Sequence, residues 1–152
     1  MDESNAKLAL LWRTRQGGGG KTHREYLDFI VNDQSLYDLF APGDFIGCLG
    51  WGKADIEAKL IAGLMLYKPS ELKTGRYMLY VCAECGDIGC GAVTVQIEKT
   101  KDAIIWKNFR FENDYDEFDS AYDAYKSIGP FRFNKTEYWQ ILNDRLSNLE
   151  VG

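Results

Sequence analysis

The sequence predicts a single α+β domain over residues 1–152, in which a mainly antiparallel sheet is packed by two helices. Hydrophobic residues make up 45% of the chain, which at this length is enough to bury one core. Residues 92–97 alternate apolar and polar side chains with a period of two, as in a half-exposed strand. Residues 54–65 and 135–149 instead repeat apolar side chains at helical spacing.

The first predicted element of the sheet is an N-terminal hairpin. Two apolar runs, Leu8–Trp12 and Tyr26–Val31, read as its strands. Arg13–Arg15 ends the first strand, and the run Gln16–Gly20 then interrupts regular structure. We therefore expect a hairpin with a long, flexible tip.

Two helices are predicted next. Ser35 is a suitable N-cap for a short helix over residues 36–40. A longer helix covers residues 54–65 and is followed by a loop over residues 68–75. Its predicted apolar face consists of Ile56, Leu60, Ile61 and Leu64, with Asp55, Glu57 and Lys59 on the other side.

The second half of the chain predicts a three-stranded meander and a final helix. The strands cover residues 77–81, 92–97 and 103–111. Residues 112–126 are acidic and aromatic, and we expect irregular structure with a short helix over 119–125. A short extended piece, residues 130–133, precedes the last helix. Asn134 and Glu137 resemble a capping box at its start, and its apolar face consists of Tyr138, Leu142, Leu146 and Leu149.

Charge and hydropathy exclude several classes of protein. The net charge of −5 argues against a large basic surface for nucleic acid and favours a basic partner. No apolar run approaches the roughly 20 residues that cross a bilayer, so we expect no membrane partner. The charged start, Met1–Lys7, is unlike a signal peptide. These features predict a cytoplasmic protein with reduced cysteines.

Three of the four cysteines, Cys82, Cys85 and Cys90, lie within nine residues. A Cys-x2-Cys turn followed by glycine can present two thiolates to a zinc ion, which takes four ligands in structural sites. Cys48 is the first candidate for the fourth ligand, with His23 and Asp87 as further candidates. The alternative is a structural turn whose reduced thiols pack as small apolar groups. Redox chemistry is the least favoured interpretation, because no thioredoxin-like βαβ pattern surrounds these residues.

The cysteine stretch also carries a resemblance. Residues 79–95, together with 106–115 and 129–133, resemble a family of small uncharacterised bacterial proteins. Its members share a core of Cys-x2-Cys-Gly-Asp-(Leu or Ile)-Gly-Cys-Gly-Ala followed by a strand pair. The resemblance implies a bacterial origin and makes the cysteine motif a family trait. It implies no activity, so it assigns no catalytic residue.

The Gly-rich run is not expected to bind nucleotide. Gly20-Lys21-Thr22 is similar to the end of a Walker A motif, but Arg15 stands where that motif needs glycine. A phosphate-binding loop also needs a helix after Lys-Thr, whereas Tyr26–Val31 predicts a strand.

The negative charge is concentrated in one segment. Glu112, Asp114, Asp116, Glu117, Asp119 and Asp123 lie within twelve residues, and without these six charges the chain would carry +1. Aromatic side chains are interleaved with them. Carboxylates steer a basic partner and aromatic rings supply buried contact area. The alternative is a solvated loop whose rings pack into the core. The predicted partner-binding residues are Asp114, Tyr115, Asp116, Glu117, Phe118, Asp119 and Tyr122.

These observations predict an interaction protein, in concrete form a bacterial immunity protein that neutralises a basic toxin such as a nuclease. No catalytic residue and no cofactor are assigned under this hypothesis. The alternative is a zinc-binding protein or metalloenzyme. Its metal ligands would be Cys82, Cys85, Cys90 and Cys48.

Overall fold

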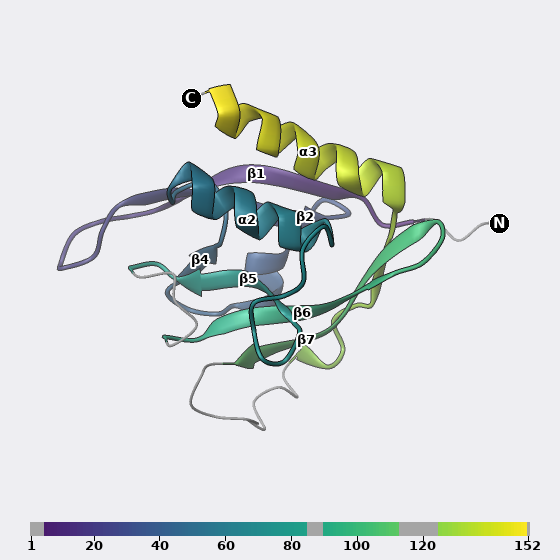
Figure 1. Ribbon diagram of the computed structural model, residues 1–152. Coiled ribbons are helices and arrows are strands. Elements are labelled where there is room, and N and C mark those ends of the chain that lie inside the picture. Colours follow the sequence, from purple (N-terminus) through teal and green to yellow (C-terminus); the bar gives the residue numbers. More distant parts are fainter. Residues whose placement is uncertain (1–4, 85–89, 113–124, 152) are drawn as a thin grey trace.

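The computed structural model describes residues 5–84, 90–112 and 125–151. These residues form two antiparallel sheets and three helices, which confirms the predicted fold class (Figure 1). The helices are α1 (Leu36–Phe40), α2 (Ala54–Leu64) and α3 (Lys135–Val151). The first sheet has the order β1 (Leu8–Arg15), β2 (Arg24–Val31), β3 (Gln34–Ser35). The second has the order β4 (Phe45–Gly47), β5 (Tyr77–Cys82), β6 (Ala92–Lys99), β7 (Ala103–Glu112), β8 (Phe131–Asn134).

The predicted hairpin is confirmed, but its strands are longer than expected. β1 and β2 pair from Leu8–Val31 to Arg15–Arg24. The arginines continue the strand instead of ending it, because their side chains form ion pairs with neighbouring segments. At the tip, the backbones of Gly18 and Lys21 exchange two hydrogen bonds of 3.0 Å. The three glycines 18–20 have positive φ angles, a conformation that glycine adopts at no steric cost. The tip is therefore a tight turn.

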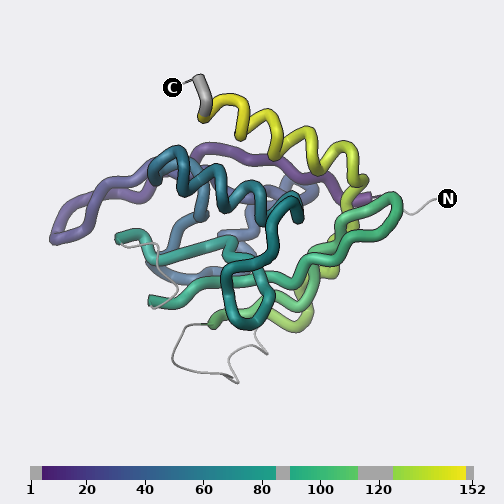
Figure 2. Tube along the Cα trace, viewed as in Figure 1, coloured from purple at the N-terminus to yellow at the C-terminus, as the bar shows by residue number. Residues whose placement is uncertain are grey.

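The predicted sheet is divided into two sheets that are joined at both ends. The amide of Ala6 donates to the carbonyl of Arg132 at 2.7 Å, beside a parallel bridge between Ala6 and Phe133. Figure 2 shows this contact, where the purple start of β1 lies beside the yellow-green chain that enters α3. At the other end, Leu27 donates to the carbonyl of Leu49 at 2.9 Å. The two sheets thus share the main hydrophobic core.

The core is centred on Trp106 of β7, which is fully buried. Its ring meets those of Phe29, Phe133 and Tyr138 edge to face, with centroids 5.2–6.0 Å apart. Its indole N–H donates to the hydroxyl of Tyr138, which donates to the carbonyl of Leu64. These contacts connect both sheets and both long helices.

Both predicted N-cap residues, Ser35 and Asn134, are confirmed as caps. The side chain of Ser35 accepts from the amide of Asp38 at 3.1 Å at the start of α1. Asn134 accepts from the amide of Glu137 at 2.9 Å at the start of α3. The carboxylate of Glu137 pairs with Lys7. The short helix predicted over 119–125 falls almost entirely outside the described residues.

The prediction for α2 was wrong on two side chains. Ile61 and Leu64 are buried as expected, but Ile56 is 52% exposed. Glu57, expected on the polar side, is 2% exposed. The reason is that α3 packs across α2 and supplies Arg145 as a partner for Glu57.

Among the described residues, the helices are too short or too polar to cross a membrane.

Candidate functional site

The predicted partner-binding residues lie outside the described residues, between the end of β7 and the start of β8. The structure does describe the two ends of this segment, Glu112 and Tyr125. Both ends are attached to the body of the protein by specific contacts. The residues that cannot be placed are Asp114, Tyr115, Asp116, Glu117, Phe118, Asp119 and Tyr122.

Glu112 is buried, although the sequence grouped it with the acidic run. Its side chain is 7% exposed, and Arg76 Nε lies 3.2 Å from Glu112 Oε1. The hydroxyl of Thr94 donates to the same oxygen at 2.8 Å, and that of Thr74 donates to Oε2 at 3.0 Å. A buried carboxylate needs such partners to offset the loss of hydration. Glu112 therefore fixes the end of β7 and is not available to a partner.

Tyr125 fixes the other end. Its ring lies against Phe40 of α1, with centroids 4.8 Å apart, and Phe40 in turn lies against Phe109 of β7. Burial of the Tyr125 ring raises the pKa of its hydroxyl. The carbonyl of Tyr125 accepts from the amide of Ile128 at 3.0 Å. The acidic segment thus leaves and re-enters the fold at two fixed points.

The structure places three of the four cysteines. Cys82 is half-buried at the end of β5, and Cys90 is exposed just before β6. Because Val81 pairs with Ala92, these two cysteines lie at the same end of the β5–β6 pair. Cys85 falls outside the described residues.

Cys48 lies apart from Cys82. Phe45 pairs with Cys82, whereas the amide of Cys48 donates to the carbonyl of Leu79. Three positions along a strand correspond to roughly 10 Å. The Cys48 thiol is buried, and burial raises its pKa well above the ordinary value. Within residues 5–84, 90–112 and 125–151, no three His, Cys, Asp or Glu side chains are grouped to hold a metal ion.

A polar cluster that the sequence did not suggest connects the hairpin to the cysteine stretch. It consists of Arg15, Thr22, Asp44 and Glu84. Arg15 makes two hydrogen bonds to the Asp44 carboxylate, at 2.8 and 2.9 Å, and a third to Glu84 at 2.7 Å. The amide and hydroxyl of Thr22 donate to Glu84 at 3.0 and 2.8 Å. These donors, first the Thr22 amide and then Arg15, lower the pKa of Glu84 to about 2.

We assign this cluster a structural role. The four side chains satisfy one another and hold the base of the Gly-rich tip beside the residue that precedes Cys85. The element that follows Lys21 and Thr22 is the strand β2. A phosphate-binding loop would need a helix at this place, so the cluster does not form one. Arg24 of β2 adds a further contact, since its Nε donates to the carbonyl of Ala83 at 2.9 Å and its guanidinium lies over Trp51.

A second polar cluster lies in the core around Asp28, which is 2% exposed. Its carboxylate accepts from the hydroxyl of Tyr80 at 2.5 Å, from Ser35 at 2.6 Å and from Arg13 at 3.2 Å. Burial, and then the Asp28 charge, raise the pKa of Tyr80 well above its ordinary value. Through these hydrogen bonds the Asp28 carboxylate connects β2 to β1, β3 and β5. The cluster has no poised base or nucleophile, so we assign it no catalytic role.

Comparisons with protein-family models, with curated proteins and with solved structures find no match for this chain.

Proposed function

We propose that this chain is an interaction protein whose acidic aromatic segment, residues 113–124, binds a basic protein surface. In concrete form it is a bacterial immunity protein that neutralises a basic toxin, such as a nuclease, by covering its active face. The observation that carries the proposal is the attachment of this segment at both ends, through the buried Glu112 and through Tyr125, which packs against the core.

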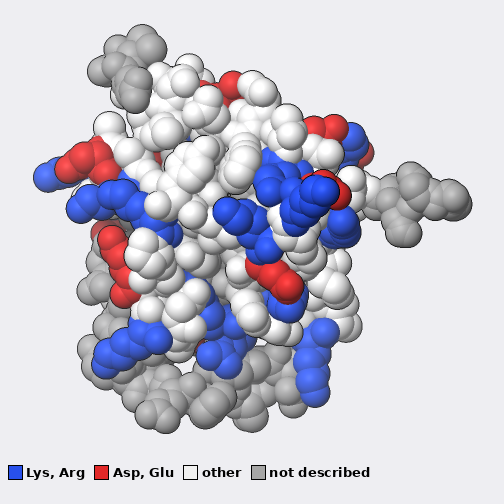
Figure 3. Space-filling model, turned by 45° about the vertical axis from the view of Figure 1, so that its right-hand side comes forward, with Lys and Arg blue, Asp and Glu red and all other residues white. Residues whose placement is uncertain are grey.

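The distribution of charge supports this proposal. The described residues contain all eighteen Lys and Arg side chains but fifteen of the twenty-three Asp and Glu side chains. On the face shown in Figure 3, Lys and Arg predominate over Asp and Glu among the described residues. The negative charge of the chain is thus concentrated in a few segments, of which residues 113–124 carry the most. A concentrated charge of one sign accelerates the encounter with a partner of the opposite sign.

The mode of action follows from the residue types. The carboxylates Asp114, Asp116, Glu117 and Asp119 steer the basic partner, and the rings of Tyr115, Phe118 and Tyr122 supply the buried contact area. Fixed ends reduce the conformational entropy that a binding segment loses when it engages a partner. In this mode of action the chain would inhibit the toxin by binding to it tightly, and it would not need to catalyse a reaction.

The test uses the protein encoded by the gene next to that of this chain. The two proteins are co-expressed, growth of the host is recorded, and the affinity is measured by calorimetry at two salt concentrations. We expect rescue of growth and an affinity that falls as salt rises. Asp116→Lys with Glu117→Lys should lower the affinity at least tenfold.

The matched control is Asp102→Lys with Asp144→Lys, which changes the charge equally at two exposed sites on the described surface. This control should bind within about twofold of wild type. Unchanged binding by the Asp116/Glu117 variant would contradict the assignment of the segment, and a neighbouring gene that encodes a metabolic enzyme would contradict the immunity function.

The alternative proposal, zinc binding, is supported by one observation. The β5–β6 pair holds Cys82 and Cys90 at the same end of two neighbouring strands, with Cys85 between them in sequence. Zinc needs three or four such ligands. Elemental analysis of protein purified without chelator tests it, and we expect near-stoichiometric zinc that is lost in Cys82→Ser but retained in Cys48→Ser. Absence of zinc from the wild-type protein would remove this alternative.

A further inference from the structure

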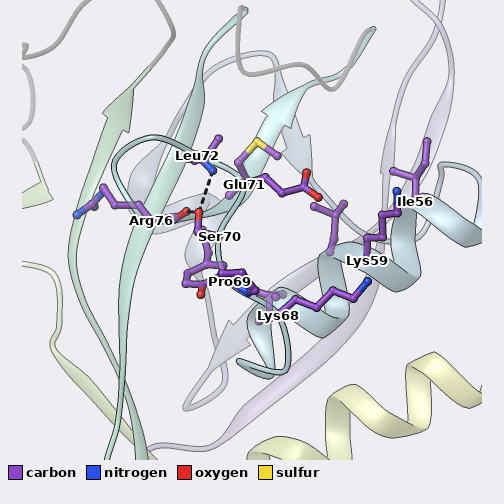
Figure 4. Close-up of a pocket in the computed structure, with 13 residues that line it drawn as sticks. Ile56, Lys59, Lys68, Pro69, Ser70, Glu71, Leu72 and Arg76 are labelled. Carbon is purple, nitrogen blue, oxygen red and sulfur yellow. Dashed lines mark hydrogen bonds between the residues drawn. The ribbon is translucent and has the colours of Figure 1, made fainter.

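We propose that the pocket between α2, the loop that follows it and β5 binds a small apolar molecule with one negative charge, such as a medium-chain carboxylate. The pocket has a volume of about 310 Å³, at the lower end of the range of roughly 300–1,000 Å³ that small-molecule sites occupy. Figure 4 shows its lining side chains. Ligand binding in this pocket would not involve residues 113–124, and it goes beyond the function proposed above.

The lining of the pocket is largely apolar. α2 supplies Leu60 and Leu64, and β5 supplies Tyr77 and Met78. Ile56, near the start of α2, is an apolar side chain that is 52% exposed. An apolar ligand in the pocket would remove part of this surface from water, at roughly 25 cal/mol per Å². The lining thus favours a hydrocarbon chain or ring as one part of the ligand.

The charges around the pocket favour an anion as the other part. Lys59 of α2 and Lys68 of the loop are both exposed and line the pocket. Among the described residues, neither ammonium group has an ion pair or a hydrogen bond. Glu71 is the one carboxylate in the lining. Two ammonium groups opposed by one carboxylate leave a net charge of +1.

Arg76 also contributes to the lining, but its charge is used elsewhere. Its guanidinium points away from Lys59 and Lys68 in Figure 4 and pairs with Glu112 in the interior. Lys59 and Lys68 therefore determine the sign of the charge that the ligand should carry, which is negative.

The wall of the pocket is formed without a ligand. The hydroxyl of Ser70 donates to the carbonyl of Arg76 at 2.5 Å and accepts from the amide of Leu72 at 3.0 Å, the bond drawn in Figure 4. The amide of Gly75 donates to the carbonyl of Leu72 at 3.0 Å. These bonds close the loop on itself, so little conformational entropy is lost when a ligand enters.

The test compares three probes: decanoate, decylammonium and acetate. Each is titrated below its micelle concentration into isotopically labelled protein, and the amide signals of Leu60, Gly63 and Tyr77 are followed by NMR. We expect decanoate to shift these signals and to bind at least fivefold more tightly than decylammonium. Acetate, which has the charge without the chain, should leave them unchanged.

Variants separate the contributions. Lys59→Gln with Lys68→Gln should weaken decanoate about threefold to tenfold, the range expected for two exposed charge pairs. Glu71→Gln should strengthen it. The control, Lys53→Gln with Lys73→Gln, removes two exposed lysines outside the lining and should bind within twofold of wild type. Equal binding of decylammonium, equal loss in the control, or shifts confined to other amides would each overturn the proposal.

Discussion

Arg145 of α3 holds the buried carboxylate of Glu57 on α2 in a two-point contact. Its Nε donates to Glu57 Oε2 at 2.7 Å and its Nη2 donates to Oε1 at 3.2 Å. The Glu57 side chain is 2% exposed and that of Arg145 is 19% exposed. This pair connects the two long helices on the surface of the core.

We expect Arg145→Met to lower the free energy of unfolding by about 3 kcal/mol, because it leaves a buried carboxylate without its partner. Removal of both charges in Glu57→Leu with Arg145→Met should recover at least about 1 kcal/mol of this loss. Urea denaturation measures both values, with the exposed Asn143→Met on the same helix as control. A double variant no more stable than Arg145→Met would contradict the expectation.

The bonds that Glu84 accepts from Arg15 and Thr22 of the hairpin should stabilise the protein in a pH-dependent way. The pKa of Glu84 is about 2 in the folded protein against an ordinary value of 4.5. A lowered pKa means that the stabilisation is fully present above pH 4.5 and is lost as the pH falls toward 2. Carboxyl NMR titration should show a higher Glu84 pKa in Arg15→Gln, whereas Lys21→Gln should leave it unchanged. An unchanged Glu84 pKa in Arg15→Gln would refute the role of this arginine.

The exposure of the cysteines predicts an order of thiol reactivity. In metal-free native protein, we expect an aromatic disulfide reagent to modify the exposed Cys90 and to leave Cys48 intact. Cys48 is 6% exposed, and burial raises the pKa of its thiol, so little thiolate is present at neutral pH. Mass spectrometry of digested protein identifies the modified sites, with guanidinium-unfolded protein as control. Labelling of Cys48 ahead of Cys90 would show that its site opens.

The glycine that follows the third cysteine is required by the fold. Gly91 has a φ angle of +97°, and a Cβ at this position would meet the ring of Phe111. Gly91→Ala should therefore lower the free energy of unfolding by about 3 kcal/mol through backbone strain and overpacking. Gly52→Ala, at a position with open space, should change it by less than about 0.5 kcal/mol. Equal stability of the two variants would contradict this account.

Local patterns predicted most of the fold. The strand over residues 92–97 and the N-caps Ser35 and Asn134 depend on patterns within a few residues, and the structure confirms them. The half-exposed character predicted for that strand was wrong, because Thr94 is as buried as its apolar neighbours Val93 and Val95. The division into two sheets could not be predicted, because it depends on hydrogen bonds such as Leu27 to Leu49, which no local pattern records. The burial of Glu57 was missed for the same reason, since its partner is 88 residues away.

The candidate sites were predicted less completely. The sequence grouped Glu112 with the acidic residues that follow it, and its burial depends on Arg76, just before β5, and on Thr94 of β6. The spacing of the cysteines could not show that Phe45, and not Cys48, is the neighbour of Cys82 across the sheet, because that depends on the register of β4 and β5. The acidic segment itself remains a prediction.

The bridge between Ala6 and Phe133 has a consequence for biosynthesis. A ribosome delivers residue 6 long before residue 133, so the contact between the two sheets at this end cannot form until residue 133 has emerged. Until then, β7 lacks β8 and the start of β1 lacks its neighbour, which leaves two open strand edges. A nascent chain halted before residue 131 would present these edges to other chains, and its survival in the cell would depend on chaperones.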